Sequence, residues 1–196
     1  MSGAPGPAAD ISGRRLTPVV FIQGGGDGAH VADRALASSL QAQLDTGCSV
    51  RYPKMPNEAD PSYDAWRDRI AAELDAQPAG AVLVAHSVGG TILLRYLAEN
   101  GTAKPIRGTF LVAIPFCGTG GWHIPGMELP KDSATRIAAA APIFFYHNRD
   151  DDVVPFDHLG FYRELFPQST IRASDTGGHQ FNNDLSEVAR DIKNLP

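Results

Sequence analysis

Cysteine is scarce in this chain of 196 residues, which contains only Cys48 and Cys117. Two cysteines cannot build a disulfide framework, and no cluster of Cys and His residues has the spacing of metal ligands. A chain of this length can bury a core large enough to fold without such cross-links. We therefore expect a protein of a reducing, cytoplasmic environment that holds no metal.

Basic clusters and long apolar runs are also missing. The chain has 17 Lys and Arg against 22 Asp and Glu, a net charge of −5, which argues against nucleic-acid binding. No apolar stretch approaches the roughly 20 residues that a membrane-spanning helix needs. The first nine residues are mostly small residues and proline, without the basic and then apolar order of a signal peptide.

Short apolar runs alternate along the chain with segments whose apolar residues recur at helical spacing, such as residues 32–44. Six such runs cover residues 19–22, 49–52, 81–85, 110–116, 143–146 and 170–173. This alternation predicts a three-layer α/β/α sandwich with a mostly parallel sheet of about six strands. Residues 1–15 lack apolar periodicity and are expected to form a flexible tail. Residues 16–196 are expected to form one domain with a short insertion at 117–141.

Two helix starts are predicted from local signals. Asp60 followed by Pro61 is typical of an N-cap with a proline in the first turn, just before an amphipathic stretch. Asp184 and Glu187 have the spacing of a capping box at the start of the last helix.

Residues 85–90 join the apolar third strand directly to an amphipathic helix. A turn this tight requires small residues two positions before and after its centre, which Ala85 and Gly89 provide. The Ser87 hydroxyl would then stand exposed at the edge of the sheet, beside the free N–H of Val88. The segment resembles the G-x-S-x-G nucleophile elbow of α/β-hydrolases, with Ala85 in place of the first glycine. The alternative is a serine that only caps the helix.

The resemblance implies that a nucleophilic Ser87 is followed by an acid and then a histidine, each after a later strand. The acid loop of the family often reads D-x-V-V-P, and this register selects Asp151. Asp150 and Asp152 are the alternatives if the loop is offset by one residue. Aspartates here could also simply form a turn and begin a helix.

His179 follows the sixth strand on a glycine-containing loop, which is where the resembled family keeps its base. We expect this loop to be hinged, so that the imidazole can swing over Ser87. His86 adjoins Ser87 but is expected to point away across the elbow.

A glycine loop at residues 24–26 follows the first strand. In the resembled family this loop supplies a second backbone N–H to the oxyanion hole, together with Val88. The register makes Gly25 the donor, with Gln23 where the family often has histidine. Gly24 and Gly26 remain alternatives.

Gly24, Gly26 and Ala29 also satisfy the dinucleotide-binding pattern G-x-G-x-x-G/A. That function requires an acidic residue at the end of the next strand, to bind a ribose hydroxyl. The first candidate, Glu58, comes only after two prolines. This context disfavours a dinucleotide, and we expect no cofactor.

The resemblance covers residues 17–194 and is strongest to small single-domain serine hydrolases akin to retinoblastoma-binding protein nine. It implies hydrolysis of a small carboxylic ester or thioester through a triad of Ser87, Asp151 and His179. In the insertion, Trp122 and Met127 could form an apolar wall that binds the substrate, or could only pack against the sheet. The alternatives for the whole chain are an inactive binding protein of the same fold and a dinucleotide-dependent enzyme. The sequence does not indicate an oligomeric state.

Overall fold

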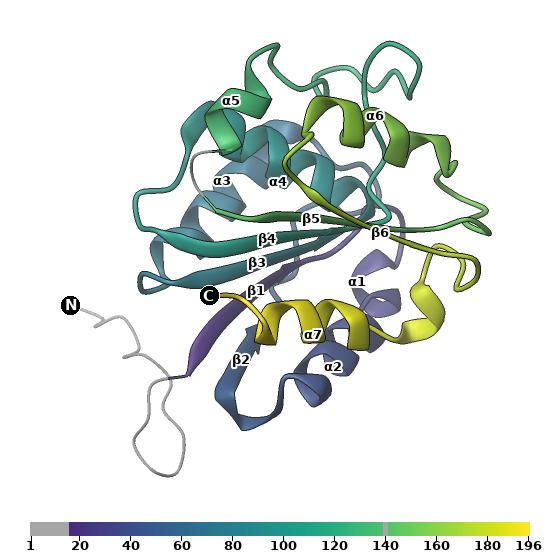
Figure 1. The fold of residues 1–196 in the computed structure, drawn as a ribbon. Helices are drawn as coiled ribbons and strands as arrows, with labels where there is room; N and C mark the ends of the chain where they lie inside the picture. Colours follow the sequence, from purple (N-terminus) through teal and green to yellow (C-terminus); the bar gives the residue numbers. More distant parts are fainter. Residues whose placement is uncertain (1–15, 139–140) are drawn as a thin grey trace.

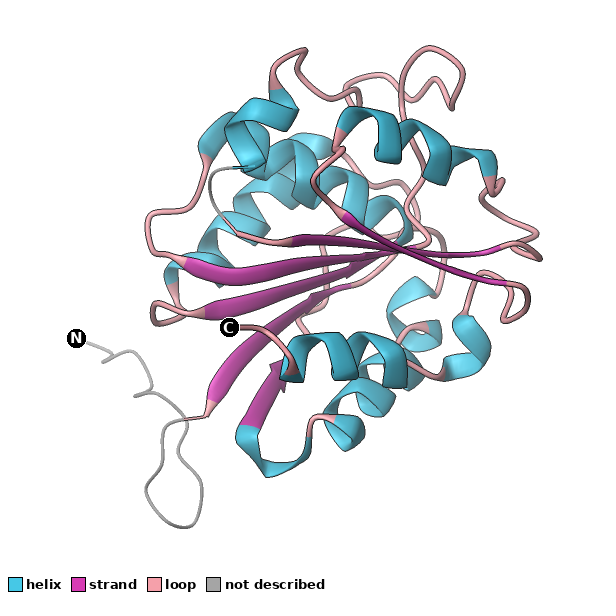
Figure 2. Ribbon diagram, viewed as in Figure 1, coloured by secondary structure: helices cyan, strands magenta, loops and turns pink. Residues whose placement is uncertain are grey.

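The computed structural model describes residues 16–138 and 141–196, in which strands and helices alternate (Figures 1 and 2). The strands are β1 (Thr17–Ile22), β2 (Cys48–Arg51), β3 (Ala81–His86), β4 (Ile106–Val112), β5 (Ile143–Asn148) and β6 (Thr170–Ser174). The α-helices are α1 (Ala29–Ala32), α2 (Arg34–Gln43), α3 (Tyr63–Asp75), α4 (Ser87–Asn100), α5 (Ser133–Ala138), α6 (Asp157–Leu165) and α7 (Ser186–Lys193). Two 3₁₀ turns span Asp45–Gly47 and Phe181–Asn183. The tail predicted for residues 1–15 lies outside the described residues.

The six strands form one sheet in the order β2-β1-β3-β4-β5-β6, and every neighbouring pair is parallel. Helices α3, α4, α5 and α6 cover one face of the sheet, and α1, α2 and α7 cover the other (Figure 1). The predicted α/β/α sandwich is confirmed.

Both faces of the sheet are buried, because successive side chains of a strand point to opposite sides. In β1, Val19 and Phe21 pack in the core beneath α2 and α7, whereas Val20 and Ile22 pack against α3 and α4. All four side chains are at most 1% exposed. The continuous apolar runs of the sequence are thus the strands that helices cover on two sides.

The order in which successive strands are added to the sheet reverses between β1 and β3. From β1 the chain passes outward to β2, and it then returns to the other side of β1 to build β3 and the remaining strands. In such sheets ligands bind beyond the carboxyl ends of the strands, near the point of reversal. The carboxyl ends lie toward the right of Figure 2, where the strand arrows point.

At this edge of the sheet, the junction between β3 and α4 brings the backbone of α4 into contact with the backbone that follows β1. Ser87 begins α4 with φ of 52°, a left-handed conformation that a non-glycine residue rarely adopts. Two residues on, a Cβ added at Gly89 would overlap the carbonyl oxygen of Gln23, at the end of β1. Only glycine at position 89 lets the helix cross β1 this closely.

Three predicted boundaries are wrong, each for its own local reason. The strand predicted at 110–116 is β4, which ends at Val112 because Ala113 has φ of 50°. Helix α3 begins at Tyr63 rather than at Asp60, whose own backbone closes a turn with Asn57. The pattern at 32–44 is divided at Asp33, whose carboxylate bonds to the Gly24 amide.

The predicted capping box of the last helix is also wrong. Helix α7 begins at Ser186, and the Asp184 carboxylate accepts a hydrogen bond from the Ser186 amide at 2.8 Å. Glu187 instead binds Arg190 one turn along the helix surface. The acidic pair is therefore used for a turn and an ion pair.

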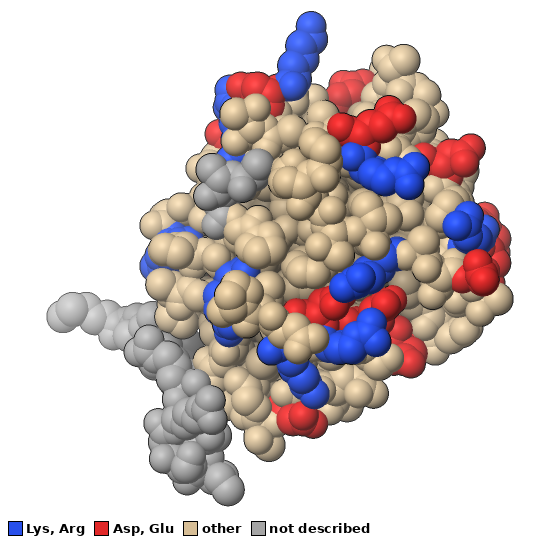
Figure 3. Space-filling model, in the orientation of Figure 1, with Lys and Arg blue, Asp and Glu red and all other residues tan. Residues whose placement is uncertain are grey.

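Charges of both signs are interspersed on the face of the molecule shown in Figure 3. Among the described residues, no helix combines the length and apolar character needed to cross a membrane.

Replacing Gly89 by alanine should destabilise the fold by about 1–3 kcal/mol or more, because the new methyl group would force α4 away from β1. The matched control is Gly160→Ala in α6, where an added Cβ meets no atom within 4 Å. That control should raise stability by up to about 1 kcal/mol, since alanine favours a helix. Urea unfolding monitored by circular dichroism measures both. Equal stabilities of the Gly89 variant and the wild type would refute the close crossing.

Candidate active site

His179 lies between Ser87 and Asp151, on the loop that follows β6. Its Nε2 is 3.1 Å from Ser87 Oγ, and its Nδ1 is 2.9 and 3.1 Å from the two Asp151 oxygens. An ionised carboxylate only accepts hydrogen bonds, so Nδ1 carries the ring proton and the lone pair of Nε2 faces the serine hydroxyl. The structure thus joins the three predicted side chains, which follow β3, β5 and β6, in one chain of hydrogen bonds.

Asp151 is the acidic residue of its loop that contacts the histidine. Burial alone would raise the pKa of Asp151, but several hydrogen bonds outweigh this effect and hold the pKa below its usual range. The donors are the rings of His147 and His179 and the backbone amides of Val153 and Val154. The side chain has 0% exposure. Asp151 is therefore ionised, as an acceptor for the ring proton must be.

The neighbouring aspartates do not contact His179 in this way. Asp150 accepts hydrogen bonds from the amides of Gly177 and Gly178, at 3.1 and 2.8 Å, and Asp152 is exposed. Asn148 Nδ2 also donates to the carbonyl oxygen of Gly178 at 2.8 Å. The loop of His179 is therefore fastened to the end of β5, whereas the sequence predicts a hinge.

In the glycine loop after β1, two of the three amides are already used. The Gly24 amide donates to Asp33 Oδ2 at 2.7 Å, and the Gly26 amide donates to the carbonyl oxygen of Glu58 at 2.6 Å. Among the hydrogen bonds within residues 16–138 and 141–196, none uses the amide of Gly25. A Cβ at Gly25 would lie 2.6 Å from Val88 Cγ1, so this glycine packs directly against the start of α4.

The other amide predicted for the oxyanion hole is that of Val88. It is the second residue of α4, and the first four N–H groups of a helix have no partner within it. The amides of Val88 and Gly25 therefore belong to neighbouring segments beside Ser87. The structure brings together all five residues predicted for the triad and the oxyanion hole.

Glu58 is a residue whose place in the site the sequence did not predict. Its Oε2 accepts hydrogen bonds from Gln23 Nε2 at 2.7 Å and from the His30 amide at 2.8 Å, and these bonds lower its pKa. Gln23 Oε1 in turn accepts from the Met55 amide at 3.1 Å. Glu58 therefore fixes both ends of the glycine loop. The acidic group that a dinucleotide would need for its ribose is already engaged here.

The His86 ring points toward the His179 loop, whereas the sequence predicts that it points away across the elbow. Its Nε2 is 3.1 Å from the carbonyl oxygen of His179, and its ring centroid is 4.7 Å from that of His179. Its Nδ1 is 2.9 Å from Asp33 Oδ2. The ring reaches the base loop because β3 ends beside the glycine loop that Asp33 holds.

Trp122 and Met127, the two residues predicted to bind substrate, pack on the α4 side of the sheet. Trp122 is half-buried and meets His158 edge-on, with ring centroids 5.5 Å apart. Met127 is 2% exposed and belongs to the core cluster on this side. Their role as a wall over Ser87 stays a prediction.

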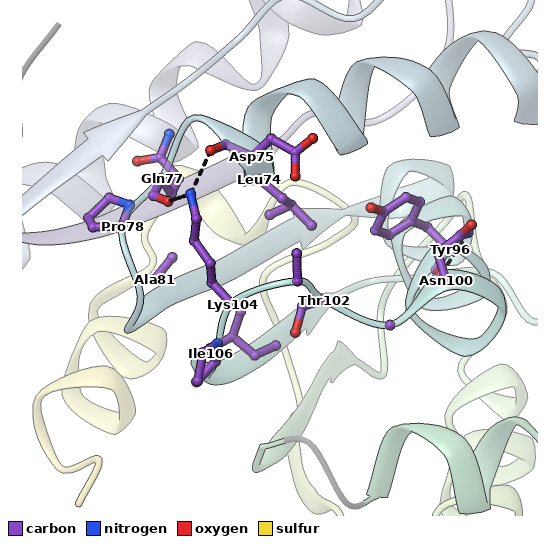
Figure 4. A pocket seen from close by; sticks show the side chains of 13 residues that line it. Leu74, Asp75, Gln77, Pro78, Ala81, Tyr96, Asn100, Thr102, Lys104 and Ile106 are labelled. Carbon is purple, nitrogen blue, oxygen red and sulfur yellow. Dashed lines mark hydrogen bonds between the residues drawn. The ribbon is translucent and has the colours of Figure 1, made fainter. Parts of the chain in front are cut away.

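A cavity of about 240 Å³ lies at the amino ends of β3 and β4, the sheet edge opposite Ser87 (Figure 4). Lys104 Nζ in this cavity donates to the carbonyl oxygens of Asp75 and Gln77, both at 2.7 Å. Cations at a helix C-terminus stabilise its unpaired carbonyl groups, so this lysine helps to end α3. The cavity is separate from the triad.

Solved structures of other proteins share this fold. The ydeN gene product of B. subtilis superposes with a TM-score of 0.75 at 20% identity, over 91% of this chain and 97% of that one. The serine hydrolase CCSP0084 of Cycloclasticus zankles gives 0.72 at 13% identity, over 90% and 88%. The esterase RhEst1 of Rhodococcus sp. ECU1013 gives 0.63 at 20% identity, over 96% and 93%. At these identities the likeness shows the fold alone.

No curated protein sequence matches the chain. The sequence profile described as "Alpha/beta hydrolase family" matches residues 19–196, which include the glycine loop, the β3–α4 junction and all three residues of the hydrogen-bonded chain. This match shows that the protein belongs to the alpha/beta hydrolase family.

Proposed function

We propose that this protein is a serine hydrolase that cleaves a small carboxylic ester or thioester through an acyl-enzyme. The observation that carries the proposal is the position of His179, hydrogen-bonded to Ser87 on one side and to Asp151 on the other. Two proteins of the same fold are named as a serine hydrolase and an esterase, which supports this class of reaction.

Acylation begins with a proton transfer. Ser87 Oγ gives its proton to His179 Nε2 and attacks the carbonyl carbon of the substrate. The imidazole then carries a positive charge, which the adjacent Asp151 carboxylate stabilises at Nδ1. Asp151 also holds the ring in the tautomer whose Nε2 can accept a proton.

The tetrahedral intermediate carries a negative charge on the former carbonyl oxygen. The amides of Val88 and Gly25 would donate hydrogen bonds to it, and the N-terminus of α4 adds the favourable end of the helix dipole. The glycine at position 25 allows the loop to approach the helix and the substrate together.

The protonated His179 next delivers its proton to the leaving alcohol or thiol, and the C–O or C–S bond of the substrate breaks. A water molecule then gives a proton to His179 Nε2 and attacks the acyl-Ser87 carbonyl. Collapse of the second intermediate returns the proton to Ser87 and releases the carboxylic acid.

A fluorophosphonate probe should label the wild-type protein, since the probe reacts with activated serine hydroxyls. Ser87→Ala should abolish the label, and the exposed Ser62→Ala should leave it unchanged. In-gel fluorescence and intact-protein mass spectrometry measure both. A folded wild-type protein that takes no label would favour an inactive binding protein instead.

Acidification should lower the rate of ester hydrolysis, and the acid side of the pH–rate profile should correspond to the uptake of a single proton. In the proposed mechanism Nε2 of His179 accepts the proton of Ser87, and it can do so only while it carries no proton of its own. Asp151 stays ionised on this side of the profile, because its hydrogen bonds hold its pKa below the usual range. The logarithm of kcat/KM against pH should therefore have a slope of about one. A flat profile from acid to neutral pH would exclude His179 as the base.

Replacing Asp151 by asparagine should lower kcat by a factor on the order of 10³–10⁴, because the ring would lose the acceptor that fixes its tautomer. Asp152→Asn is the control, since that neighbouring side chain is exposed. Similar losses in the two variants would contradict the assignment of Asp151.

Gly25→Ala should lower kcat by about 100-fold with a smaller change in KM, because the methyl group would push the amide away from the developing oxyanion. Gly47→Ala is the matched control, since a Cβ there meets no atom within 4 Å. Steady-state kinetics with p-nitrophenyl acetate measure both variants. Unchanged kcat in Gly25→Ala would remove this loop from the oxyanion hole.

A further inference from the structure

A buried acid–histidine pair lies beneath the proposed site and has no part in the reaction described above. The side chains of Asp33 and His86 are each 1% exposed, and Asp33 Oδ2 is 2.9 Å from His86 Nδ1. Asp33 follows α1, and His86 ends β3 directly before Ser87. Burying two ionisable groups costs free energy unless each is fully hydrogen-bonded, so both side chains require hydrogen-bond partners.

Both ring nitrogens of His86 face acceptors. Nδ1 faces the Asp33 carboxylate, and Nε2 is 3.1 Å from the backbone carbonyl oxygen of His179. A backbone carbonyl cannot donate, and an ionised carboxylate cannot donate either. Both contacts are hydrogen bonds only if both nitrogens carry protons, which makes the ring an imidazolium.

The surroundings of Asp33 favour its charged form. Burial would raise the pKa of Asp33, but the His86 ring, the Gly24 amide and Gln180 outweigh burial and lower it. The Gly24 amide lies 2.7 Å from Oδ2, and Gln180 Nε2 lies 3.2 Å from Oδ1. The two charges of the pair are thus matched, and both carboxylate oxygens accept hydrogen bonds.

This pair contacts or adjoins three of the backbone segments that the proposed reaction uses. Asp33 holds the glycine loop through Gly24 and the base loop through Gln180. His86 holds the base loop through the carbonyl of His179, and it is itself the residue before the nucleophile. The glycine loop, the elbow and the base loop therefore meet at one ion pair.

We propose that Asp33 and a doubly protonated His86 form a buried ion pair that positions the oxyanion loop relative to the base loop. Both are positioning residues, since they act through Gly24, Gln180 and the backbone of His179. The positioning role rests on the proposed hydrolase function, but the charge state of His86 does not.

The charge state is tested by nuclear magnetic resonance on protein labelled with ¹⁵N-histidine. Long-range ¹H–¹⁵N spectra at neutral pH should show protons on both ring nitrogens of His86, with the assignment taken from backbone experiments on the wild type. A His86 ring with one unprotonated nitrogen would overturn the ion pair. The spectrum needs neither a substrate nor a variant that folds.

The positioning role is tested by Asp33→Asn and His86→Gln with p-nitrophenyl acetate. Each should lower kcat by about 10–100-fold with KM changed by less than about twofold, because displaced reacting groups slow the chemical step more than binding. The double variant should lose little more activity than the worse single variant, since the two residues act as one unit.

The control is Asp191→Asn, which removes a comparably buried carboxylate away from the site. Asp191 is 6% exposed and accepts hydrogen bonds from Arg172 and Tyr146. It should lower the thermal midpoint but leave kcat of the folded protein unchanged. Site variants that lose only stability, like this control, would overturn the positioning role.

A wild-type protein that neither hydrolyses the ester nor takes the fluorophosphonate would overturn the proposed function, and the positioning role with it. The spectrum of His86 would still decide whether the pair is charged. The two failures are therefore distinguishable.

Discussion

The close crossing of α4 over the end of β1 is the constraint on which the rest of the site depends. No side chain fits between Gly89 and the carbonyl of Gln23, so the helix begins directly beside the glycine loop. This approach holds Ser87 in its left-handed conformation and places the first residues of α4 next to Gly25. One backbone contact thus sets the position of both the proposed nucleophile and the proposed oxyanion donors.

Carboxylates do most of the remaining positioning. Asp33 and Asp150 accept hydrogen bonds from backbone amides of two different loops, and Glu58 accepts from a backbone amide and from Gln23. Asp151 accepts from the amides of Val153 and Val154 as well as from His179. Loops have no ladder of their own to satisfy their N–H groups, and a carboxylate with two oxygens can satisfy several at once.

The strands and the candidate nucleophile could be predicted from the sequence. A sheet covered on both faces has continuous apolar runs, which mark the strands. Ser87 is a candidate nucleophile because one such run leads directly into a helix at this residue. His179 and Asp151 followed from the family resemblance. Among Gly24, Gly25 and Gly26, however, only the pattern of hydrogen bonds distinguishes Gly25, whose amide has no partner in the part of the chain that the structure describes.

The parts that could not be predicted depend on contacts between distant segments. Asp33 lies inside an apolar helical pattern, and nothing in its neighbours indicates that its carboxylate binds Gly24 and His86. The same holds for the carbonyl of His179, which a sequence does not distinguish from any other. The failed helix starts at Asp60 and Asp184 have a similar cause, because these residues use their polar groups in nearby turns.

The attachment of the His179 loop to β5 has a consequence for the proposed chemistry. The amides of Gly177 and Gly178 are held by Asp150, and a Cβ at Gly177 would lie 2.5 Å from Asn148 Nδ2, so Gly177 serves close packing. In the proposed reaction, the backbone of His179 would therefore stay in place while the leaving group departs. The alcohol or thiol would have to bind with its heteroatom already near His179 Nε2. Selectivity among leaving groups would then depend on how the alcohol or thiol half of the substrate is oriented when it binds.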